Sequence, residues 1–226
     1  MSLALLIVGA SRFELAGPLS ELGVRRPSPG VVHEAGEGLG VLLTGVGEPG
    51  PEVLDAIVGA RPRHVLQAGF AGGLRAGLAE GDLVVVKRVI DSATGEGWNA
   101  ARFEELRGGL ARMRHRMAQG PLLTVPRFLH RAEDKRDAGV AHDAVVCDME
   151  SAFVARACAE AGIPWSGVRA VSDGADRTVI PGRGERRLRG LLHPKTALGA
   201  AYMLHGGRRA QRALTEALPR AVAVLR

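Results

Sequence analysis

Two apolar runs that each end in acidic residues constrain the fold of this chain most strongly. Residues 145–151 read Val-Val-Cys-Asp-Met-Glu-Ser, and residues 168–173 read Val-Arg-Ala-Val-Ser-Asp. The Ala-rich segment between them has helical spacing and ends at Gly and Pro stop signals. We therefore predict one β-α-β unit of a parallel sheet. Ligands bind outside the carboxyl ends of such strands, so Glu150 and Asp173 are expected to face one crevice.

The rest of the chain repeats this alternation of short apolar runs and amphipathic segments, which is typical of an α/β fold. At 226 residues, we expect a single domain over residues 1–226. Further strands are expected at residues 3–8, 65–68, 83–90, 121–125 and 165–171, with a hairpin of residues 31–32 and 39–44. Residues 69–74 are expected to form a glycine-rich exit loop, residues 92–120 an irregular excursion with a short helix, and residues 127–137 a solvated helix face.

Several classes of site are disfavoured. Cys147 and Cys158 belong to no Cys-x-x-Cys or Cys/His cluster, and His33 lacks the second His of a zinc-binding helix, so neither a metal nor another cofactor is expected. Residues 45–50 match Gly-x-Gly-x-x-Gly, but no acidic residue follows at the ribose-binding position. This motif is interpreted as a tight turn before a helix with Pro51 in its first turn.

The positive charge is concentrated at the C-terminus. From residue 183 onward, ten Lys and Arg stand against two Glu, a net charge of +8 within a total of +6. Because the remainder carries −2, a general nucleic-acid binder is not expected. Residues 188–226 are expected to form two helices broken near Gly206 and Gly207. This basic segment fits either peripheral contact with an anionic membrane or a solvated helix face that closes the core.

No apolar run approaches the length of about 18 residues needed to span a bilayer. The N-terminus lacks the basic region and cleavage site of a signal peptide. A cytoplasmic location is therefore expected.

Four motifs together resemble the purine nucleoside phosphorylase and nucleosidase superfamily, most closely its adenine-nucleoside hydrolases. They are Gly9-Ala10 with Glu14, residues 69–74 followed by Gly81-Asp82, residues 148–151, and residues 169–176. The resemblance covers residues 1 to about 180, in family order and spacing. It implies a single three-layer domain with a mixed central sheet flanked by helices, no cofactor, and a homo-oligomer.

The resemblance also implies roles at the site. Cleaving an N-glycosidic bond produces a cationic sugar and an anionic base, so a general acid and carboxylates are required. Asp173 would protonate the purine, and Ser172 and Arg169 would position Asp173. Glu150 would accept hydrogen bonds from the 2′ and 3′ hydroxyls, and Met149 would pack against the ribose. Structural alternatives are that Glu150 complements a helix dipole and that Arg169 only pairs with Asp148.

The nucleophile is expected to be water. Glu14 matches the position at which hydrolytic members carry the carboxylate that activates water. Residues 9–14 lack the Gly-Asp-Pro-x-Arg phosphate loop of phosphorolytic members. Arg12 leaves phosphate open as the alternative co-substrate.

The resemblance also implies that Gly69, Phe70, Ala71 and Gly72 bind the substrate. This glycine stretch departs from one family pattern. Methylthioadenosine nucleosidases usually carry a hydroxyl residue where this chain has Phe70. Residues 69–74, 120–125 and 148–151, together with the Pro-containing basic C-terminal segment, more closely resemble the hopanoid-associated branch, whose members are thought to release adenine from adenosylhopane. The alternatives are a phosphorylase, a methylthioadenosine/S-adenosylhomocysteine nucleosidase, a non-catalytic nucleoside-binding module and, from residues 45–50 alone, a dehydrogenase.

Overall fold

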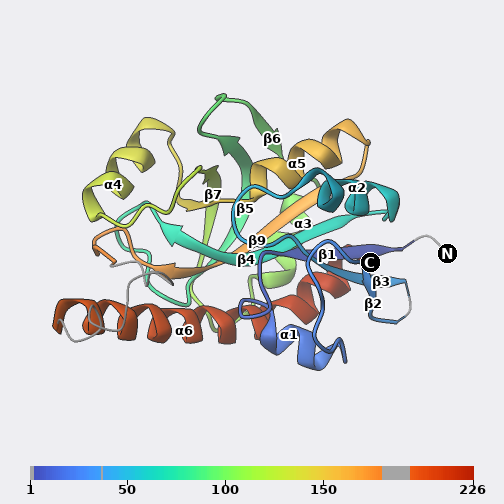
Figure 1. Ribbon diagram of the computed structural model, residues 1–226, viewed down its shortest axis with the longest axis horizontal. Coiled ribbons are helices and arrows are strands. Elements are labelled where there is room, and N and C mark those ends of the chain that lie inside the picture. Colours follow the sequence, from blue (N-terminus) through green and yellow to red (C-terminus); the bar gives the residue numbers. More distant parts are fainter. Residues whose placement is uncertain (1–2, 37, 180–193) are drawn as a thin grey trace.

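The computed structural model describes residues 3–36, 38–179 and 194–226, and the side chains of these residues except 194–204. Within this part of the chain, nine strands pair into one mixed sheet in the order β2-β3-β1-β4-β8-β7-β5-β6, and β9 pairs with both β4 and β5 (Figure 1). The strands are β1 (Leu5–Gly9), β2 (His33–Glu34), β3 (Leu39–Leu43), β4 (Val65–Gly73), β5 (Leu83–Asp91), β6 (Gly97–Asn99), β7 (Met117–Thr124), β8 (Val146–Asp148) and β9 (Trp165–Asp173). The six helices of the described residues are α1 (Ala16–Glu21), α2 (Pro51–Gly59), α3 (Phe103–Leu110), α4 (Ala132–Ala141), α5 (Ser151–Glu160) and α6 (Pro194–Leu225).

The helices cover both faces of the sheet and produce three layers. On one face, apolar side chains of α1, α3 and α6 pack against β1, β3, β4 and β9, with Leu19, Leu110 and Leu214 among them. On the other face, α2 and α5 pack against the same sheet through residues such as Ile57 and Val154. The mixed three-layer α/β fold expected from the resemblance is confirmed.

The predicted parallel β-α-β unit around α5 is wrong. Strand β9 is parallel to β4, whereas β8 is antiparallel to β4, with Gly72 opposite Cys147. Strand β8 enters the sheet between β4 and β7, and the pairings β4-β8-β7-β5-β9-β4 close into a ring. Because this ring depends on long-range pairing, the local alternation of strand and helix did not reveal the direction of β8.

Strand β4 extends through the glycine stretch that was expected to be a loop. Residues 69–71 pair in register with β9, and the register shifts between Ala71 and Gly72. A side chain at Gly69 would lie 3.0 Å from Glu14 Oε2, so the missing Cβ lets that carboxylate approach the strand. The glycines therefore serve close packing within the sheet rather than a flexible exit.

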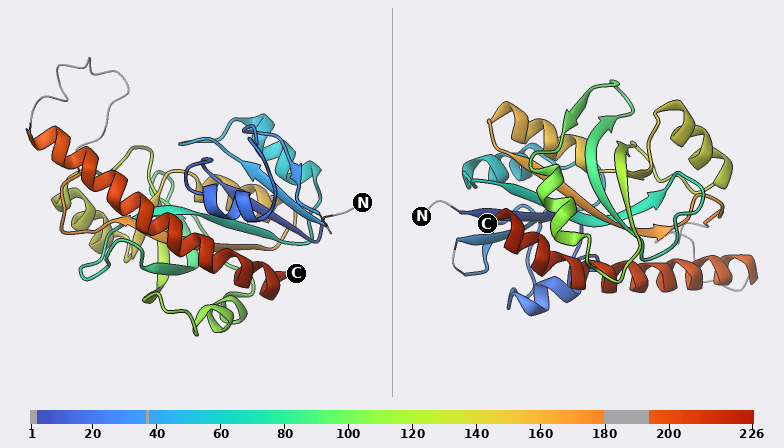
Figure 2. Two further views of the ribbon diagram at one scale, coloured as in Figure 1. Left: turned by 90° about the horizontal axis from the view of Figure 1, so that it is seen from below. Right: turned by 180° about the vertical axis from the view of Figure 1, so that it is seen from behind.

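The C-terminal segment forms one helix, α6, where two were expected. It runs along the sheet past α1 and α3 (Figure 2). Gly206 and Gly207 lie inside it without a break, because the helix packs tightly there against Ser172, Phe13 and Phe70. Here tertiary packing overrides the low helix propensity of glycine.

The described side chains of helix α6 show that residues 205–225 help to close the core, whereas contact with a membrane stays a prediction. Its buried side chains are Ala210, Ala213, Leu214, Ala217, Leu218, Ala221 and Leu225. Its exposed face includes Arg208, Arg212 and Arg220. In this described part, the apolar stripe closes the core and the exposed face is basic. No helix in the described ranges is long and apolar enough to cross one.

Replacing Gly206 with Ala is expected to destabilise the protein by about 1–3 kcal/mol, although Ala is the better helix former. A Cβ at Gly206 would overlap the carbonyl oxygen of Ser172. Gly108 of α3 is the matched control, because a Cβ there meets nothing within 4 Å. We expect Gly108→Ala to raise the melting temperature and Gly206→Ala to lower it. Equal effects of the two changes in thermal denaturation would contradict this packing.

Candidate active site

A small cavity lies at the carboxyl end of β1 and beside the middle of β4. It is lined by Gly9, Ala10, Glu14, Gln67, Ala68, Gly69, Phe70, Asp148, Glu150 and Arg169. The lining combines side chains from four of the predicted motifs. The structure therefore brings together Glu14, Gly69, Phe70, Glu150 and Arg169, which are far apart in the sequence.

Glu14 lies in the turn between β1 and α1. Its Oε2 accepts a hydrogen bond from the backbone N–H of Ala10 at 3.3 Å, and its own N–H donates to Ser11 Oγ at 3.3 Å. Burial and, second, the charge of Glu150 raise the pKa of Glu14 to about 7, against opposing contributions from Arg169 and the Ala10 amide. A carboxyl group with this pKa exchanges protons readily at neutral pH.

Glu150 immediately precedes α5 and is 8% exposed. Its carboxylate accepts hydrogen bonds from the N–H of Gly47 at 2.6 Å and from that of Met149 at 3.1 Å. Burial, followed by the charge of Asp148, raises the pKa of Glu150 to about 7. Residues 45–50 form the turn that was predicted from the sequence, with Pro51 opening α2, and this turn presents the Gly47 amide to Glu150.

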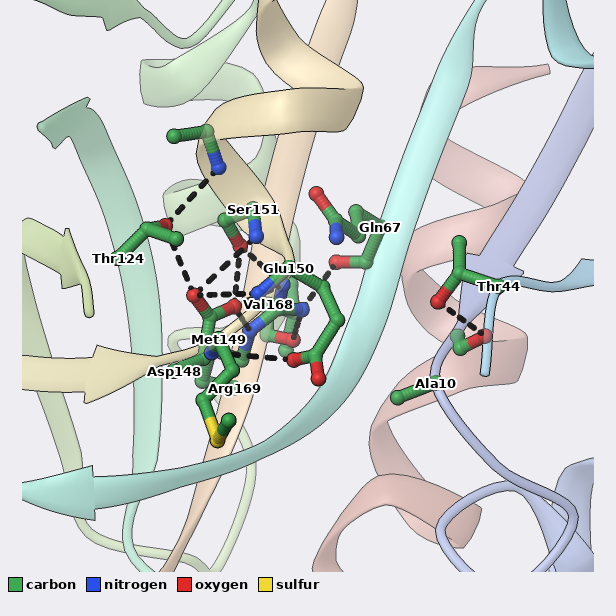
Figure 3. A network of polar contacts seen from close by, with 12 residues as sticks. Ala10, Thr44, Gln67, Thr124, Asp148, Met149, Glu150, Ser151, Val168 and Arg169 are labelled. Carbon is green, nitrogen blue, oxygen red and sulfur yellow. Dashed lines mark hydrogen bonds and ion pairs between the residues drawn. The ribbon is translucent and has the colours of Figure 1, made fainter. Parts of the chain in front are cut away.

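Arg169 and Asp148 form a buried ion pair beside the cavity (Figure 3). The Nη2 and Nε atoms of Arg169 lie 3.0 Å and 3.3 Å from Asp148 Oδ2, and Nη1 donates to the carbonyl oxygen of Gln67 at 3.0 Å. Ser151 bonds both partners, and Thr124 donates to Asp148 Oδ1 at 2.9 Å. This network fixes the turn that carries Glu150, because Asp148 also accepts the N–H groups of Glu150 and Ser151.

The expectation that Arg169 positions Asp173 is therefore corrected. The guanidinium of Arg169 is directed to Asp148, which is the structural alternative weighed from the sequence. Ser172 does contact Asp173, since its Oγ lies 2.7 Å from Asp173 Oδ1, and it also lies 3.3 Å from the carbonyl oxygen of Ala71. The ion-pair partner of Asp173 is Lys135.

Asp173 lies at the end of β9 and is 0% exposed. It is not among the described residues that line this cavity, and the prediction that Glu150 and Asp173 face one crevice stays a prediction. The end of β8 lies beside Arg169 in the middle of β9, four residues before Asp173. The side-chain carboxylate that shares the cavity with Glu150 and Asp148 is Glu14.

The remaining predicted residues surround these acids. Phe70 lines the cavity and packs edge to face on Phe13, with ring centroids 5.8 Å apart. Met149 is half-buried, and its methyl group points toward Gly47. Gly72 lies beside Asp173, because a Cβ there would be 3.5 Å from Asp173 Oδ2. No group of three or more His, Cys, Asp or Glu in the described part of the chain is arranged to hold a metal ion.

The sequence did not predict that Lys135 is buried next to Asp173. Residues 127–137 were expected to be a solvated helix face, but Lys135 is 0% exposed and pairs with Asp173. The one available signal was that residues 132–141 form no apolar stripe, so the helix needed another attachment to the core.

Comparison with known proteins agrees with this fold and these motifs. The family model described as the phosphorylase superfamily matches residues 6–180. None of the curated proteins is a significant match.

Several solved structures share the whole fold at low sequence identity. A Helicobacter pylori MTAN mutant with 5′-methylthioadenosine in its active site aligns over 97% of this chain and 99% of its own, with a TM-score of 0.73 and 20% identity. The 5′-methylthioadenosine/S-adenosylhomocysteine nucleosidase from Neisseria meningitidis, in complex with methylthio-immucillin-A, aligns over 95% and 97%, with a TM-score of 0.71 and 20% identity. A futalosine hydrolase mutant from Helicobacter pylori aligns over 95% and 98%, with a TM-score of 0.69 and 17% identity.

The enzyme class predicted from the sequence, a glycosidic-bond hydrolase or phosphorylase, is consistent with these matches. The matched region begins within β1 and ends just after β9, so it includes the entire cavity lining and the Lys135–Asp173 pair. The chain belongs to the phosphorylase superfamily.

Proposed function

We propose that this protein is a purine nucleosidase that hydrolyses the N-glycosidic bond of a 5′-substituted adenine nucleoside. The observation that carries the proposal is the pair Glu14 and Glu150, which line one cavity and both have a pKa raised to about 7. Hydrolysis of this bond needs one carboxyl group that binds the sugar and one that accepts a proton from the attacking water, and this pair can supply both.

Each acid has a separate role in the proposed reaction. Glu150 accepts hydrogen bonds from the ribose hydroxyls, which fixes the sugar as it gains positive charge. Glu14 takes a proton from the water whose oxygen forms the new bond to C1′. The electron pair of the breaking C1′–N9 bond passes to the purine, and Asp173 supplies the proton that neutralises the departing base.

The contacts of the nearby arginines favour water over phosphate. Arg12, which left phosphate open, directs its Nε to the carbonyl oxygen of Pro27 at 2.7 Å. Arg169 is the only cationic residue among the described lining, and it is paired with Asp148. Because the carboxyl groups of Glu14 and Glu150 also line the cavity, it disfavours the binding of an anionic phosphate.

The proposal also specifies the kind of group that the nucleoside carries at its 5′ position. Two of the similar structures contain methylthioadenosine or methylthio-immucillin-A, which supports an adenine nucleoside with an apolar 5′ group. Phe70 and Phe13 add apolar surface next to Glu14. Adenosylhopane remains the candidate raised by the sequence, and a homo-oligomer and membrane contact through the basic face of α6 are further predictions.

The test is release of free base from adenosine, inosine, methylthioadenosine, S-adenosylhomocysteine and adenosylhopane, each with and without phosphate. We expect adenine from at least one 5′-substituted nucleoside at a rate that phosphate does not change. A strict requirement for phosphate would support a phosphorylase instead. Tight binding of a nucleoside without any base release would support a non-catalytic binding module.

A further inference from the structure

Lys135 is the only fully buried side chain of helix α4, all of which lies in the described part of the chain. The other residues of this helix are half-buried or exposed. A surface helix ordinarily turns an apolar stripe toward the core. Helix α4 turns an ammonium group inward instead.

The ammonium group of Lys135 is directed to three acceptors around the end of β9. It bonds Asp173 Oδ2, the carbonyl oxygen of Gly174 at 3.1 Å, and that of Arg177 at 3.3 Å. These three contacts match the three N–H donors of an ammonium group. Lys135 therefore fixes the carboxylate of Asp173 and the loop that follows it.

Stability alone does not account for this arrangement. Removing two charges from water is expensive, and apolar residues of similar volume often replace a buried ion pair without loss of stability. The carboxylate that Lys135 holds is also the one assigned to the departing base. This coincidence is explained if the pair takes part in the reaction.

We propose that Lys135 is the positioning residue of Asp173 and the source of the proton that Asp173 delivers. This inference rests on the proposed nucleosidase function. One proton passes from Nζ to Oδ2 and converts the ammonium–carboxylate pair into an amine and a carboxylic acid. Asp173 then gives that proton to a ring nitrogen of the base as the C1′–N9 electron pair passes to the base. Glu14 releases the proton taken from water, and Lys135 regains one from solvent, so the cycle is balanced.

Among the described groups near Asp173, the other titratable side chains do not supply its proton, which leaves Lys135 as the source. Cys147 on β8 is buried, and its burial, together with the charge of Asp173, raises the pKa of the thiol far above neutrality, so it stays protonated. Asp148 is occupied by Arg169. On the surface of the same helix, Arg136 lies 3.9 Å from Asp176.

The decisive variant is Lys135→Arg. A guanidinium keeps the positive charge but does not release a proton in proteins, so it preserves an ion pair and prevents the transfer. We expect Lys135→Arg to fold and to lower kcat by at least about 10-fold, and Lys135→Met to lower it by about 100-fold or more. Arg136→Met, which removes a charge from the exposed side of α4, is the matched control and should keep the wild-type kcat.

Two further measurements separate this role from a structural one. In an Asp173→Asn background, adding Lys135→Met should change kcat by less than about 3-fold, because the partner of Lys135 is already lost. In the single variant Lys135→Met, the alkaline limb of the pH profile of kcat should move to lower pH, because the ammonium group that supplies the proton in the wild-type protein is gone and ammonium groups keep their protons to higher pH than carboxyl groups do.

The outcomes distinguish this inference from the function on which it rests. Full activity of Lys135→Arg, or an equal loss of kcat from Lys135→Met in both backgrounds, would overturn the role of Lys135 while wild-type base release still stood. Absence of base release by the wild-type protein from every nucleoside would overturn both. If Lys135→Met does not fold, Lys135→Arg alone decides between these results.

Discussion

Replacing Glu14 with Gln is expected to lower kcat by about 100-fold to 10,000-fold and, at pH 8, to raise the melting temperature. The first effect follows because Gln cannot accept the proton of the attacking water. The second follows because Glu14 is ionised at pH 8 in surroundings that oppose its charge. Activity and stability are thus expected to change in opposite directions at one residue.

The sign of the stability effect follows from the pKa of Glu14. Its value rises from 4.5 to about 7 on folding, so between these values the unfolded chain binds fewer protons than the folded protein. Stability therefore falls as the pH rises from 4.5 through 7. At pH 8, Glu14→Gln should add about 1–3 kcal/mol, and at pH 4 the two proteins should be nearly equal.

Thermal denaturation at pH 4 and pH 8 and initial rates of base release test this prediction. Glu48→Gln is the matched control, because Glu48 is exposed and lies near the cavity in the turn that contacts Glu150. It should change neither measurement. Wild-type kcat in Glu14→Gln would remove Glu14 from the reaction, and equal stabilities at pH 8 would contradict its raised pKa. The wild-type rate itself should increase with pH through the region near 7, as Glu14 becomes ionised.

Replacing Glu150 with Gln is expected to lower kcat/KM by about 1,000-fold for a ribonucleoside. A carboxylate accepts hydrogen bonds from two sugar hydroxyls with both oxygens, whereas an amide has one acceptor oxygen. The loss should be smaller for a 2′-deoxynucleoside, which offers only one of those hydroxyls. The wild-type preference for ribose over deoxyribose should therefore nearly disappear in Glu150→Gln.

Values of kcat/KM for adenosine and 2′-deoxyadenosine, or for the corresponding pair of the best 5′-substituted substrate, measure this effect. Glu160→Gln at the other end of α5 is the control, because Glu160 is exposed. An unchanged sugar preference in Glu150→Gln would show that Glu150 does not contact the hydroxyls. In that case its carboxylate would only organise the turn through the amides of Gly47 and Met149.

The apolar runs made most of the sheet predictable, because buried strands such as β1 and β3 consist of continuous apolar residues. The direction of β8 was not predictable, since it depends on pairing with β4 and β7 rather than on neighbouring residues. The break expected at Gly206 did not occur for a related reason. Glycine is required at position 206 because the helix contacts Ser172 there. Local helix propensity carries no information about a contact with a residue so distant in the sequence.

The acids of the site were easier to predict than their partners. Glu14, Glu150 and Asp173 follow apolar runs, where functional side chains of α/β proteins gather. Arg169 was linked to Asp173 by the family resemblance, but its long side chain bonds Asp148. Lys135 stands among charged residues of a helix without periodicity, and only the three-dimensional structure shows that it points inward to Asp173.

The central claim is that water, activated next to Glu14 and Glu150, becomes part of the sugar. The most direct test is turnover of the best nucleoside in phosphate-free buffer enriched in H₂¹⁸O, followed at once by reduction of the released sugar and its mass analysis. We expect each turnover to yield one free purine and one sugar that carries a single ¹⁸O at C1. Unlabelled sugar, or turnover that begins only when phosphate is added and yields a sugar 1-phosphate, would contradict the account.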